Sequence, residues 1–360
     1  MTENNKSTKI CFILPTLEGG GIERIVTNLS DYFVSKGHQV SILLLFKVPG
    51  NFFVPDVRIQ IFEPEIDRKK NNKYIYALYL IPYIRKTLIK INPDVIVSHG
   101  EWSNAYVVLA NAGLKYPLYL EDHMNPDLNL GLLLNTAKKL LYRYADGIIA
   151  LTNYAATRIK KQTKAKNIVV IPNPINLPEP LPSVKSNSII TIGRLSKEKG
   201  HKFLIEAFGR INRKDWILEI VGDGPEKNYL QKLSSKFDIK ENIVFHGYQK
   251  DIVSYLSKAR IFVLPSLSEC FPIALIEAMS MRLACISSDC MAGKEILVRD
   301  NVNGLLVEPG NIDSLSESLL RVMDDPCLRE TISNEAYKIR EVLDFETICS
   351  RYLDFITAKH

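Results

Sequence analysis

The 360-residue sequence lacks a hydrophobic run near the length of about 18 residues that a membrane-spanning helix needs. Its first residues, MTENNKSTK, hold no apolar segment of the kind found in secretory signals. Cysteine is scarce, and the six residues form no C-x-x-C pair, which argues against disulfides and zinc sites. We therefore expect a cytoplasmic protein with reduced, mostly buried thiols at Cys11, Cys270, Cys285, Cys290, Cys327 and Cys349.

Two ligand-binding motifs are also missing. There is no D-x-D sequence, so nothing predicts a bound divalent metal ion. The glycines at 19–21 lack the G-x-G-x-x-G spacing of dinucleotide-binding loops, so NAD is not expected. Internal repeats and low-complexity tracts are absent as well, which excludes solenoid and fibrous classes.

Negative charge is scarce in the first half of the chain. Residues 1–180 hold 22 Lys and Arg against 15 Asp and Glu, whereas the remainder holds 24 against 25. A basic first half suggests contact with an anionic partner there, and an ordinary solvated surface explains it equally well. We expect no nucleic-acid partner.

Short apolar segments alternate with helical patterns along the whole chain, which predicts an α/β protein with two Rossmann-like, doubly wound domains. Prolines concentrate in residues 172–182, a segment that predicts a stiff linker. We expect an N-terminal domain at 1–176, a C-terminal domain at 177–343, and a last helix at about 344–360 that packs back on the first domain. Ligands of such domains bind at the carboxyl ends of the strands. The expected strands are 10–15, 40–46, 95–98, near 119, 148–151, 168–171, 188–192, 216–221, 242–245, 261–265 and 283–287.

The loop at 193–200, GRLSKEKG, follows a strand and precedes a helix. Arg194 and Lys199 lie five residues apart across this turn, after Gly193. A guanidinium and an ammonium group together neutralise a diphosphate without a metal ion. A basic surface turn is the alternative explanation of this loop by itself.

The segment 269–277, ECFPIALIE, contains the sharper motif. Pro272 suits the first turn of a helix, so the backbone from Cys270 to Ile273 offers N–H groups to an anion. Glu269 and Glu277 are eight residues apart, about 12 Å along a helix, and carboxylates accept hydrogen bonds from sugar hydroxyls.

Weaker motifs end other strands. Gly222 and Asp223 belong to the turn GDGPE, and Gly20 and Gly21 belong to GGGIER in the first half. A histidine, His123, ends the strand of YLEDH, and His99 ends another. Each of these is as well explained by a structural role when it is taken alone.

Together, GGGIER (19–24), EDH (121–123), GRLSKEKG, GDGPE and ECFPIALIE resemble the retaining glycosyltransferases of family 4, which have the GT-B fold. The resemblance implies that Gly20, Gly21 and Ile22 approach the donor phosphate. It implies roles for Arg194 and Lys199 on the diphosphate, for Glu277 on the ribose and for Glu269 on the donor sugar.

The same resemblance places the backbone of Phe271 to Ile273 near the sugar, Tyr248 and Gln249 near the base, and His123 at the reaction centre. No cofactor, metal ion or protein nucleophile is implied, because the leaving phosphate takes the acceptor proton. The family has glycine where Cys270 stands here, which alters the local contact to the sugar.

The stretches 287–296 and 303–307 are similar to those of bacterial transferases that move galactose, glucose or N-acetylgalactosamine from UDP to lipid-linked glycans and surface polymers. The resemblance therefore implies a UDP-sugar donor and a glycan acceptor carried by a polyprenyl diphosphate. A GDP-mannose-dependent transferase, a sugar-nucleotide epimerase and a non-catalytic partner subunit are the alternatives.

Two basic, amphipathic segments occur in the first half. Residues 128–144 place leucines on one helical face beside Lys138, Lys139 and Arg143, and residues 68–91 combine RKKNNK with an apolar helix. Such segments suit an anionic lipid surface, although each also suits packing on the sheet. We expect peripheral binding of the N-terminal domain to the inner face of the plasma membrane.

Overall fold

The computed structural model describes residues 7–47, 53–66, 72–290 and 298–358. The chain divides into an N-terminal unit, residues 1–176 and 344–360, and a C-terminal unit, residues 177–343. The division falls within the proline-rich segment, at the boundary expected from the sequence, and the last helix joins the first unit as expected. The ligand roles that we assigned to the two domains stay predictions.

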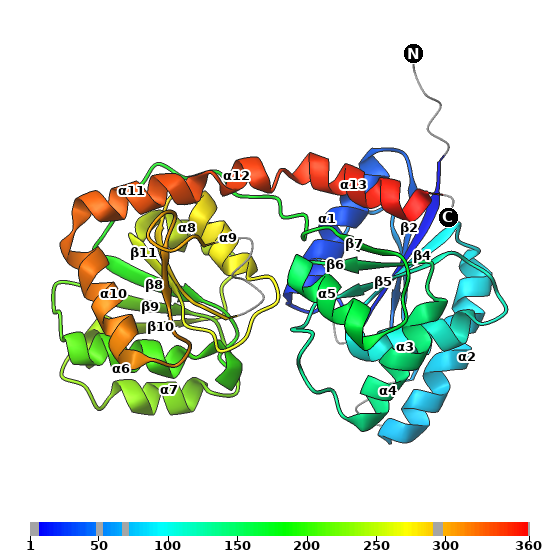
Figure 1. Cartoon of the computed structure of the whole chain (residues 1–360), viewed down its shortest axis with the longest axis horizontal. Coiled ribbons are helices and arrows are strands. Elements are labelled where there is room, and N and C mark those ends of the chain that lie inside the picture. The colour runs from blue at the N-terminus through cyan, green and yellow to red at the C-terminus, as the bar shows by residue number, and fades with distance from the viewer. Residues whose placement is uncertain (1–6, 48–52, 67–71, 291–297, 359–360) are drawn as a thin grey trace, which may run out of the picture. The chain divides into compact units, whose positions relative to one another are not determined.

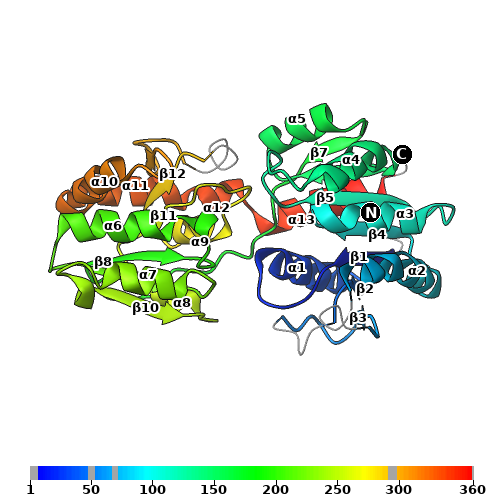
Figure 2. The same cartoon turned by 90° about the horizontal axis from the view of Figure 1, so that it is seen from below.

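The N-terminal unit contains a seven-stranded parallel sheet in the order β3-β2-β1-β4-β5-β6-β7, which can be followed across Figure 2. Its strands are apolar because helices cover both faces of a parallel sheet. The order reverses beside β1, where β4 is the other neighbour, and such a switch point is where doubly wound sheets bind ligands. The strands are β1 (Lys9–Leu14), β2 (Gln39–Leu44), β3 (Gln60–Phe62), β4 (Val95–His99), β5 (Leu118–Asp122), β6 (Gly147–Ala150) and β7 (Ile168–Val170).

Helices cover the two faces of this sheet unequally. Figure 1 shows α1 and α13 on one face and α2 to α5 on the other. The second face forms a hydrophobic core with residues of α2, α3 and α5. The helices are α1 (Gly21–Ser35), α2 (Lys73–Ile91), α3 (Glu101–Asn111), α4 (Leu132–Leu141), the 3₁₀ turn η2 (Tyr142–Tyr144), α5 (Asn153–Gln162) and α13 (Phe345–Thr357).

The C-terminal unit contains a six-stranded parallel sheet in the order β10-β9-β8-β11-β12-β13. Its order reverses between β8 and β11, which are hydrogen-bonded neighbours. The strands are β8 (Ser188–Ile192), β9 (Ile217–Val221), β10 (Ile243–Gly247), β11 (Ile261–Leu264), β12 (Ala284–Ser288) and β13 (Leu305–Val307).

In the C-terminal unit, α6, α7 and α10 lie on one face of the sheet and α8, α9 and α11 on the other (Figure 1). Its core consists mainly of aliphatic side chains, leucine and isoleucine above all, together with Phe208 and Trp216. The helices are α6 (His201–Ile211), α7 (Lys227–Ser234), α8 (Ile252–Lys258), α9 (Ile273–Ser280), α10 (Ile312–Asp324), α11 (Pro326–Tyr337) and α12 (Ile339–Val342), with the 3₁₀ turns η3 (Lys197–Lys199) and η4 (Lys240–Asn242).

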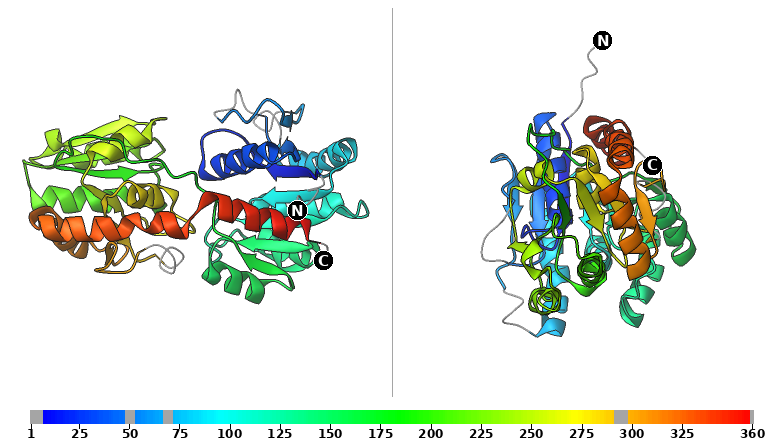
Figure 3. Two further views of the ribbon diagram at one scale, coloured as in Figure 1. Left: turned by 90° about the horizontal axis from the view of Figure 1, so that it is seen from above. Right: turned by 90° about the vertical axis from the view of Figure 1, so that its left-hand side faces the viewer.

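The last helix, α13, lies beside α1, as Figure 3 shows in red and blue. Phe345 packs edge-on against Tyr32 of α1, and Phe355 packs against Tyr119 of β5. The amphipathic pattern of this segment predicted the packing, because its apolar face has no other place to be buried in the unit.

The α/β class and nearly all of the expected strands are confirmed within one or two residues. Two strands escaped the sequence analysis, β3 and β13, which are three residues long and too short for a periodic pattern. The cysteines are free, as expected; five are buried, and Cys327 is exposed. No helix in the described ranges combines the length and the apolar character needed to cross a bilayer.

Candidate functional site

The loops that follow β8, β9 and β10 in the C-terminal unit are joined by backbone hydrogen bonds. Gly193 N–H donates to the carbonyl of Val221 at 3.0 Å, and Gly222 N–H donates to that of Gly247 at 2.8 Å. Gly222 has φ of +144°, and a Cβ there would stand 1.9 Å from the carbonyl oxygen of Gly193. Only glycine permits this approach, so the turn GDGPE is needed to bring the three loops together.

The loop after β11 packs on the turn η3 of the first loop. Gly200, with φ of +66°, approaches Pro265 so closely that a Cβ would meet its carbonyl oxygen at 2.0 Å. Leu267 N–H donates to the carbonyl of Glu198 at 2.8 Å. The motifs at 193–200 and 269–277, about 70 residues apart in the sequence, therefore meet at the switch point between β8 and β11.

Lys199 and Glu269 form an ion pair at this point, with Nζ 2.6 Å from Oε1. The hydroxyl of Ser266 donates to the same oxygen at 2.7 Å. Glu269 is buried, whereas the Lys199 side chain is 29% exposed. The two residues for which the sequence predicted diphosphate and sugar contacts thus lie within one hydrogen bond of each other.

The remaining residues expected on the first loops are accessible. Arg194 is exposed and makes no ion pair within the described part of the chain. Asp223 accepts the N–H of Gly224 at 2.7 Å and pairs with Lys227 at 2.8 Å, and the Lys227 ammonium lowers the pKa of this carboxyl. Asp223 is therefore a charged group at the mouth of the β9 loop.

Two more expected residues follow β10. Tyr248 is about half exposed, and Gln249 donates from its side-chain nitrogen to the carbonyl of His246 at 2.8 Å. Their position at a strand's carboxyl end agrees with a ligand contact, and the contact to a base stays a prediction.

Helix α9 begins at Ile273, with Pro272 as the residue before it. The first N–H groups of a helix have no partner inside it, so this end of α9 attracts anions. Cys270 and Phe271 are buried just before the helix, and Glu277 is 2% exposed within it. A buried carboxylate is costly unless it is hydrogen-bonded, which gives Glu277 a defined geometry.

In the N-terminal unit, Gly20 precedes α1 and Gly21 and Ile22 open it. The carboxylate of Glu23 folds back on this end, so that a Cβ on Gly20 would meet it at 2.2 Å. The hydroxyl of Thr16 donates to the same carboxylate at 3.2 Å. The three residues expected near a phosphate therefore form a helix start at the switch point of the first sheet.

His123 lies in a buried cluster at the carboxyl ends of β4 and β5. Its Nε2 is 3.0 Å from Nδ1 of His99 and 3.4 Å from Oε1 of Glu121. Tyr352 of α13 donates to Oε2 of Glu121 at 2.5 Å. The cluster thus joins His123 to the last helix of the chain.

Burial governs the protonation of this cluster. Loss of hydration raises the pKa of Glu121 to about 8 and lowers the pKa of His123 to about 4. Burial, together with the charge of His123, lowers the pKa of His99 well below its usual value. At neutral pH both histidines are therefore uncharged, and the carboxyl group of Glu121 is protonated.

A metal ion would find three ligand atoms here, because His99, Glu121 and His123 offer atoms within 4.8 Å of one another. His99 Nε2 is also buried without a hydrogen-bond partner among the described residues. Of the atoms that could bind the ion, Oε2 of Glu121 already accepts a hydrogen bond from Tyr352, and Nδ1 of His99 already contacts Nε2 of His123. The expectation of a metal-free site stays a prediction.

A second buried network surrounds Asp122, the residue between Glu121 and His123. Lys138 donates to Oδ2 at 2.6 Å, and Asn104 and Tyr142 donate to Oδ1 at 3.0 and 2.7 Å. Lys138 was expected on a basic surface, and that expectation is wrong, because this ion pair buries it. Helix α4 is also shorter than the segment 128–144.

Glu121 and Tyr352 belong to the buried cluster around His123 but were not predicted from the sequence. The available signal for Glu121 was a carboxylate at the end of an apolar strand, where a buried charge requires a partner. Tyr352 gave no such signal, because it stands on the apolar face of a helix far along the chain.

Two family patterns match the sequence. That described as "Glycosyltransferase Family 4" matches residues 19–179, and that described as "Glycosyl transferases group 1" matches residues 175–339. The UDP-Gal:α-D-GlcNAc-diphosphoundecaprenol α-1,3-galactosyltransferase of Escherichia coli is 32% identical over 400 residues, covering all of both chains. The chain belongs to glycosyltransferase family 4, and it is a transferase enzyme.

Another relative comes from Campylobacter jejuni. Its GalNAc-α-(1→4)-GalNAc-α-(1→3)-diNAcBac-PP-undecaprenol α-1,4-N-acetyl-D-galactosaminyltransferase is 25% identical and is aligned over 97% of this chain and 98% of that protein.

Solved structures agree on the fold. Sucrose-phosphate synthase from Thermosynechococcus elongatus has a TM-score of 0.86 at 18% identity, over 97% of this chain and 98% of that one. Anabaena HepE in complex with UDP and glucose has a TM-score of 0.83 at 19% identity, over 98% and 100%. The two units are thus the Rossmann-like domains of a GT-B glycosyltransferase, as the motifs indicated.

Proposed function

We propose that this enzyme transfers galactose, glucose or N-acetylgalactosamine from UDP to a glycan on a polyprenyl diphosphate, with retention of the anomeric configuration. The pairing of Lys199 with Glu269 at the switch point of the C-terminal sheet carries the proposal. A cation for the diphosphate and a buried carboxylate for a sugar hydroxyl are thereby placed side by side.

The donor's charge fits this end of the C-terminal unit. A diphosphate would take its hydrogen bonds from Arg194, from Lys199 and from the first N–H groups of α9. As it binds, the ammonium of Lys199 would be shared between the phosphate and Glu269, so no buried charge would lose its partner. Glu277, in the second turn of α9, would accept hydrogen bonds from the ribose.

Retention needs no protein nucleophile in this scheme. The leaving diphosphate, stabilised by Arg194 and Lys199, would take the proton of the attacking hydroxyl. His123 would contact the donor sugar through Nδ1, since Nε2 faces His99 and Glu121. Catalysis would then rest on positioning and on stabilisation of charge in an oxocarbenium-like state.

The acceptor is proposed from the relatives and from the surface of α4. The Escherichia coli and Campylobacter jejuni relatives are named for acceptors on diphosphoundecaprenol. Leu132 and Leu133, at the start of α4, are 86% and 81% exposed, and Lys139 follows them on the same helix. Exposed leucines beside lysines suit the face of an anionic bilayer, so we propose peripheral binding through the N-terminal unit.

The proposal is tested by thermal unfolding with UDP, GDP and ADP and their common sugars, in EDTA. Ligand at 100 times its dissociation constant stabilises the folded state by about 2.7 kcal/mol, or roughly 5–10 °C for a domain of this size. We expect a shift with UDP and one UDP-sugar that disappears in Arg194→Ala. The matched control is Lys232→Ala, an exposed cation on α7 that also removes one positive charge.

Other outcomes would change the proposal in defined ways. A shift with GDP alone would replace the donor by GDP-mannose. A shift that appears only when magnesium chloride replaces EDTA would contradict the metal-free site. The absence of any shift in folded protein would contradict the whole donor assignment.

A further inference from the structure

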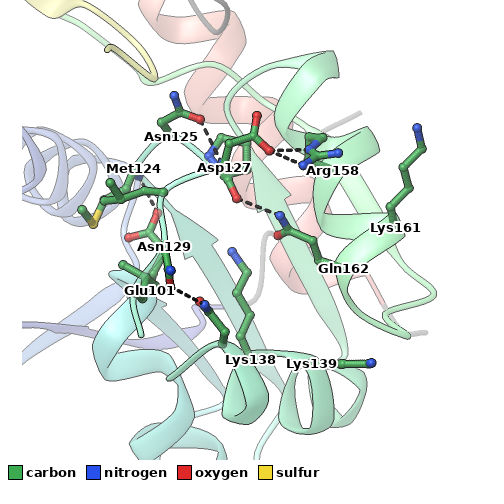
Figure 4. A pocket seen from close by; sticks show the side chains of 14 residues that line it. Glu101, Met124, Asn125, Asp127, Asn129, Lys138, Lys139, Arg158, Lys161 and Gln162 are labelled. Atoms are coloured by element: carbon green, nitrogen blue, oxygen red, sulfur yellow. Dashed lines mark hydrogen bonds and ion pairs between the residues drawn. The ribbon is translucent and has the colours of Figure 1, made fainter. Parts of the chain in front are cut away.

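A pocket of about 430 Å³ lies in the N-terminal unit, between a loop and helices α4 and α5 (Figure 4). Arg158 is matched there by Asp127, at 2.6 Å from its Nε. The side chains of Lys139 and Lys161 point away from one another, as Figure 4 shows. This pocket therefore has no group of converging positive charges, whereas a second pocket, in the C-terminal unit, has one.

The second pocket, of about 280 Å³, is lined by four cations and one carboxylate. The cations are Lys185, Arg260, Arg282 and Arg329, and the carboxylate is that of Glu330. None of the four forms an ion pair with a carboxylate in the part of the chain that the structure describes. Most of the positive charge on the walls therefore has no counter-charge from the protein.

The pocket lies at the edge of the C-terminal sheet where the strands begin. Lys185, Arg260 and Arg282 precede β8, β11 and β12, which are neighbours in the sheet, and Arg329 belongs to the first turn of α11. The loops proposed to bind the donor follow the other ends of these strands. Because β8 has five residues, the two edges are about 16 Å apart along it. The pocket is thus separate from the proposed donor site.

Hydrogen bonds to the backbone bring these cations together. Lys185 donates from Nζ to the carbonyl of Arg282 at 2.8 Å, and Arg260 donates from Nη2 to the carbonyl of Lys185 at 3.1 Å. Burial, together with the charges of Arg260 and Arg282, lowers the pKa of Lys185. Burial and the charge of Arg260 also lower the pKa of Arg329, against the opposite effect of Asp325. The cations repel one another, and a bound anion would remove that cost.

Two of the guanidinium groups are held in place by neutral partners. Arg329 donates from Nη1 to two carbonyls at the end of α10, at 2.7 and 3.1 Å, and lies 5.7 Å from the centroid of the Trp216 ring. Arg282 donates from Nη1 to Asn334 at 3.1 Å and lies 4.0 Å from the centroid of the Tyr337 ring. The groups are thus ordered before any ligand arrives, which lowers the cost of binding.

Hydrogen-bond donors remain for a ligand. Nη2 of Arg282 and Nη2 of Arg329 make no hydrogen bond with any residue that the structure describes. Nε of Arg260 is buried and has no partner among the same residues. A guanidinium group matches two oxygens of a phosphate. The volume lies just below the range of about 300–1,000 Å³ for drug-sized ligands, which favours a small anion over a whole nucleotide.

We propose that this pocket binds a small soluble anion with a phosphoryl group, of the class of phosphate, diphosphate or a sugar phosphate. The inference is independent of the proposed transfer reaction, because no residue of the donor scheme lines the pocket. Since only the folded chain brings the four cations together, the anion would stabilise the folded C-terminal unit.

The test titrates inorganic pyrophosphate into the full chain by calorimetry, at low ionic strength and without phosphate buffer. We expect Lys185→Gln/Arg282→Gln to weaken binding by about tenfold or more, because two charges that face the anion are lost. The matched control is Lys232→Gln/Lys236→Gln, which removes two exposed charges of the same unit outside the pocket. Arg282→Glu changes a single exposed residue and provides the same test if the double variant does not fold.

A further variant, Arg194→Ala, separates this pocket from the donor site, where a diphosphate would also bind. We expect Arg194→Ala to keep the pyrophosphate binding that the pocket variant loses. The opposite pattern would assign pyrophosphate to the donor site alone and overturn the proposal.

Other outcomes also count against the pocket. Equal effects of the pocket variant and the lysine control would show that only overall charge matters. No binding of pyrophosphate or phosphate to folded protein at millimolar concentration would contradict the proposal. If instead the protein bound phosphatidylglycerol vesicles and the pocket variant alone lost that binding, the cations would contact lipid headgroups and the proposal would be wrong.

Discussion

The hydrogen bond between Tyr352 and Glu121 provides a test of how the last helix supports His123. Tyr352→Phe removes one hydroxyl and leaves the ring, which packs against Phe33 at a centroid distance of 6.2 Å. Because both partners are buried, water cannot replace the lost donor. Glu121 would keep His123 and His99 as its remaining polar neighbours.

The expected loss follows from the burial of the carboxyl group. Leaving a buried acceptor without its donor costs about 1–3 kcal/mol, which is roughly 2–12 °C in the melting temperature of a domain of this size. The hydroxyl of Tyr352 lowers the pKa of Glu121, so its loss raises that pKa further and keeps the carboxyl protonated to higher pH. Without the Tyr352 hydroxyl, the imidazoles of His99 and His123 are the remaining polar neighbours of Glu121, which changes how His123 is held. We expect kcat of Tyr352→Phe to fall by about tenfold, with KM for the donor unchanged.

The assay combines thermal unfolding with sugar transfer measured from pH 6 to 9. The control is Tyr32→Phe, because Tyr32 also links α1 to α13, through a 3.0 Å hydrogen bond to the largely exposed Glu346. Water replaces that bond, so the control should lose less than about 1 kcal/mol and no activity. If both variants behaved alike in stability and in pH profile, the argument that α13 positions His123 through Glu121 would be refuted.

Three further results are expected. Lys199→Ala should lower the free energy of unfolding by about 1–3 kcal/mol and abolish the shift in melting temperature with UDP. The double variant Lys199→Ala/Glu269→Ala should regain the free energy of unfolding but not UDP binding. Chemical denaturation measures the first quantity and calorimetry the second. Gly222→Ala should lower the free energy of unfolding, measured in denaturant, by about 2–4 kcal/mol, because the new Cβ would stand 1.9 Å from a carbonyl oxygen. Gly113→Ala, with open space around its position, should lower it by only about 1 kcal/mol. Equal losses in the two variants would refute the close approach at Gly222. The pKa of Glu121 is raised to about 8, so near neutral pH the folded state holds a proton that the unfolded state has lost. The free energy of unfolding should therefore fall by about 2 kcal/mol between pH 6.5 and 8. An equal dependence of the unfolding free energy on pH in Glu121→Gln would contradict this.

Local pattern was sufficient for the architecture of each unit. Apolar segments of four to six residues bounded by turns predicted β1, β8 and β11 nearly to the residue. Such elements are determined by neighbours in the sequence, through hydrophobic periodicity and chain-breaking residues. The edge strands β3 and β13 are short and depend on pairing with a distant partner, so no local pattern revealed them.

In the candidate site, too, local sequence pattern predicted some features and long-range contacts determined the others. Motifs at strand ends predicted Arg194, Lys199, Glu269 and Glu277 as residues for a phosphorylated sugar, since the carboxyl ends of parallel strands meet at one edge. The spacing of these four residues in the sequence did not show which of them are in contact. The ion pair of Lys199 with Glu269 follows from the adjacency of β8 and β11, strands that the chain order separates by two others.

The sequence by itself determined the α/β class, the division at the proline-rich segment, the transferase family and the strand-end residues, because all of these depend on short-range pattern. The tertiary structure decided that Tyr352 of the last helix holds Glu121 beside His123, and that Lys138 is buried against Asp122. Those contacts join residues up to 231 positions apart, and burial then sets their charge. Only the folded chain brings such residues within hydrogen-bond distance, so only the folded chain defines their chemistry.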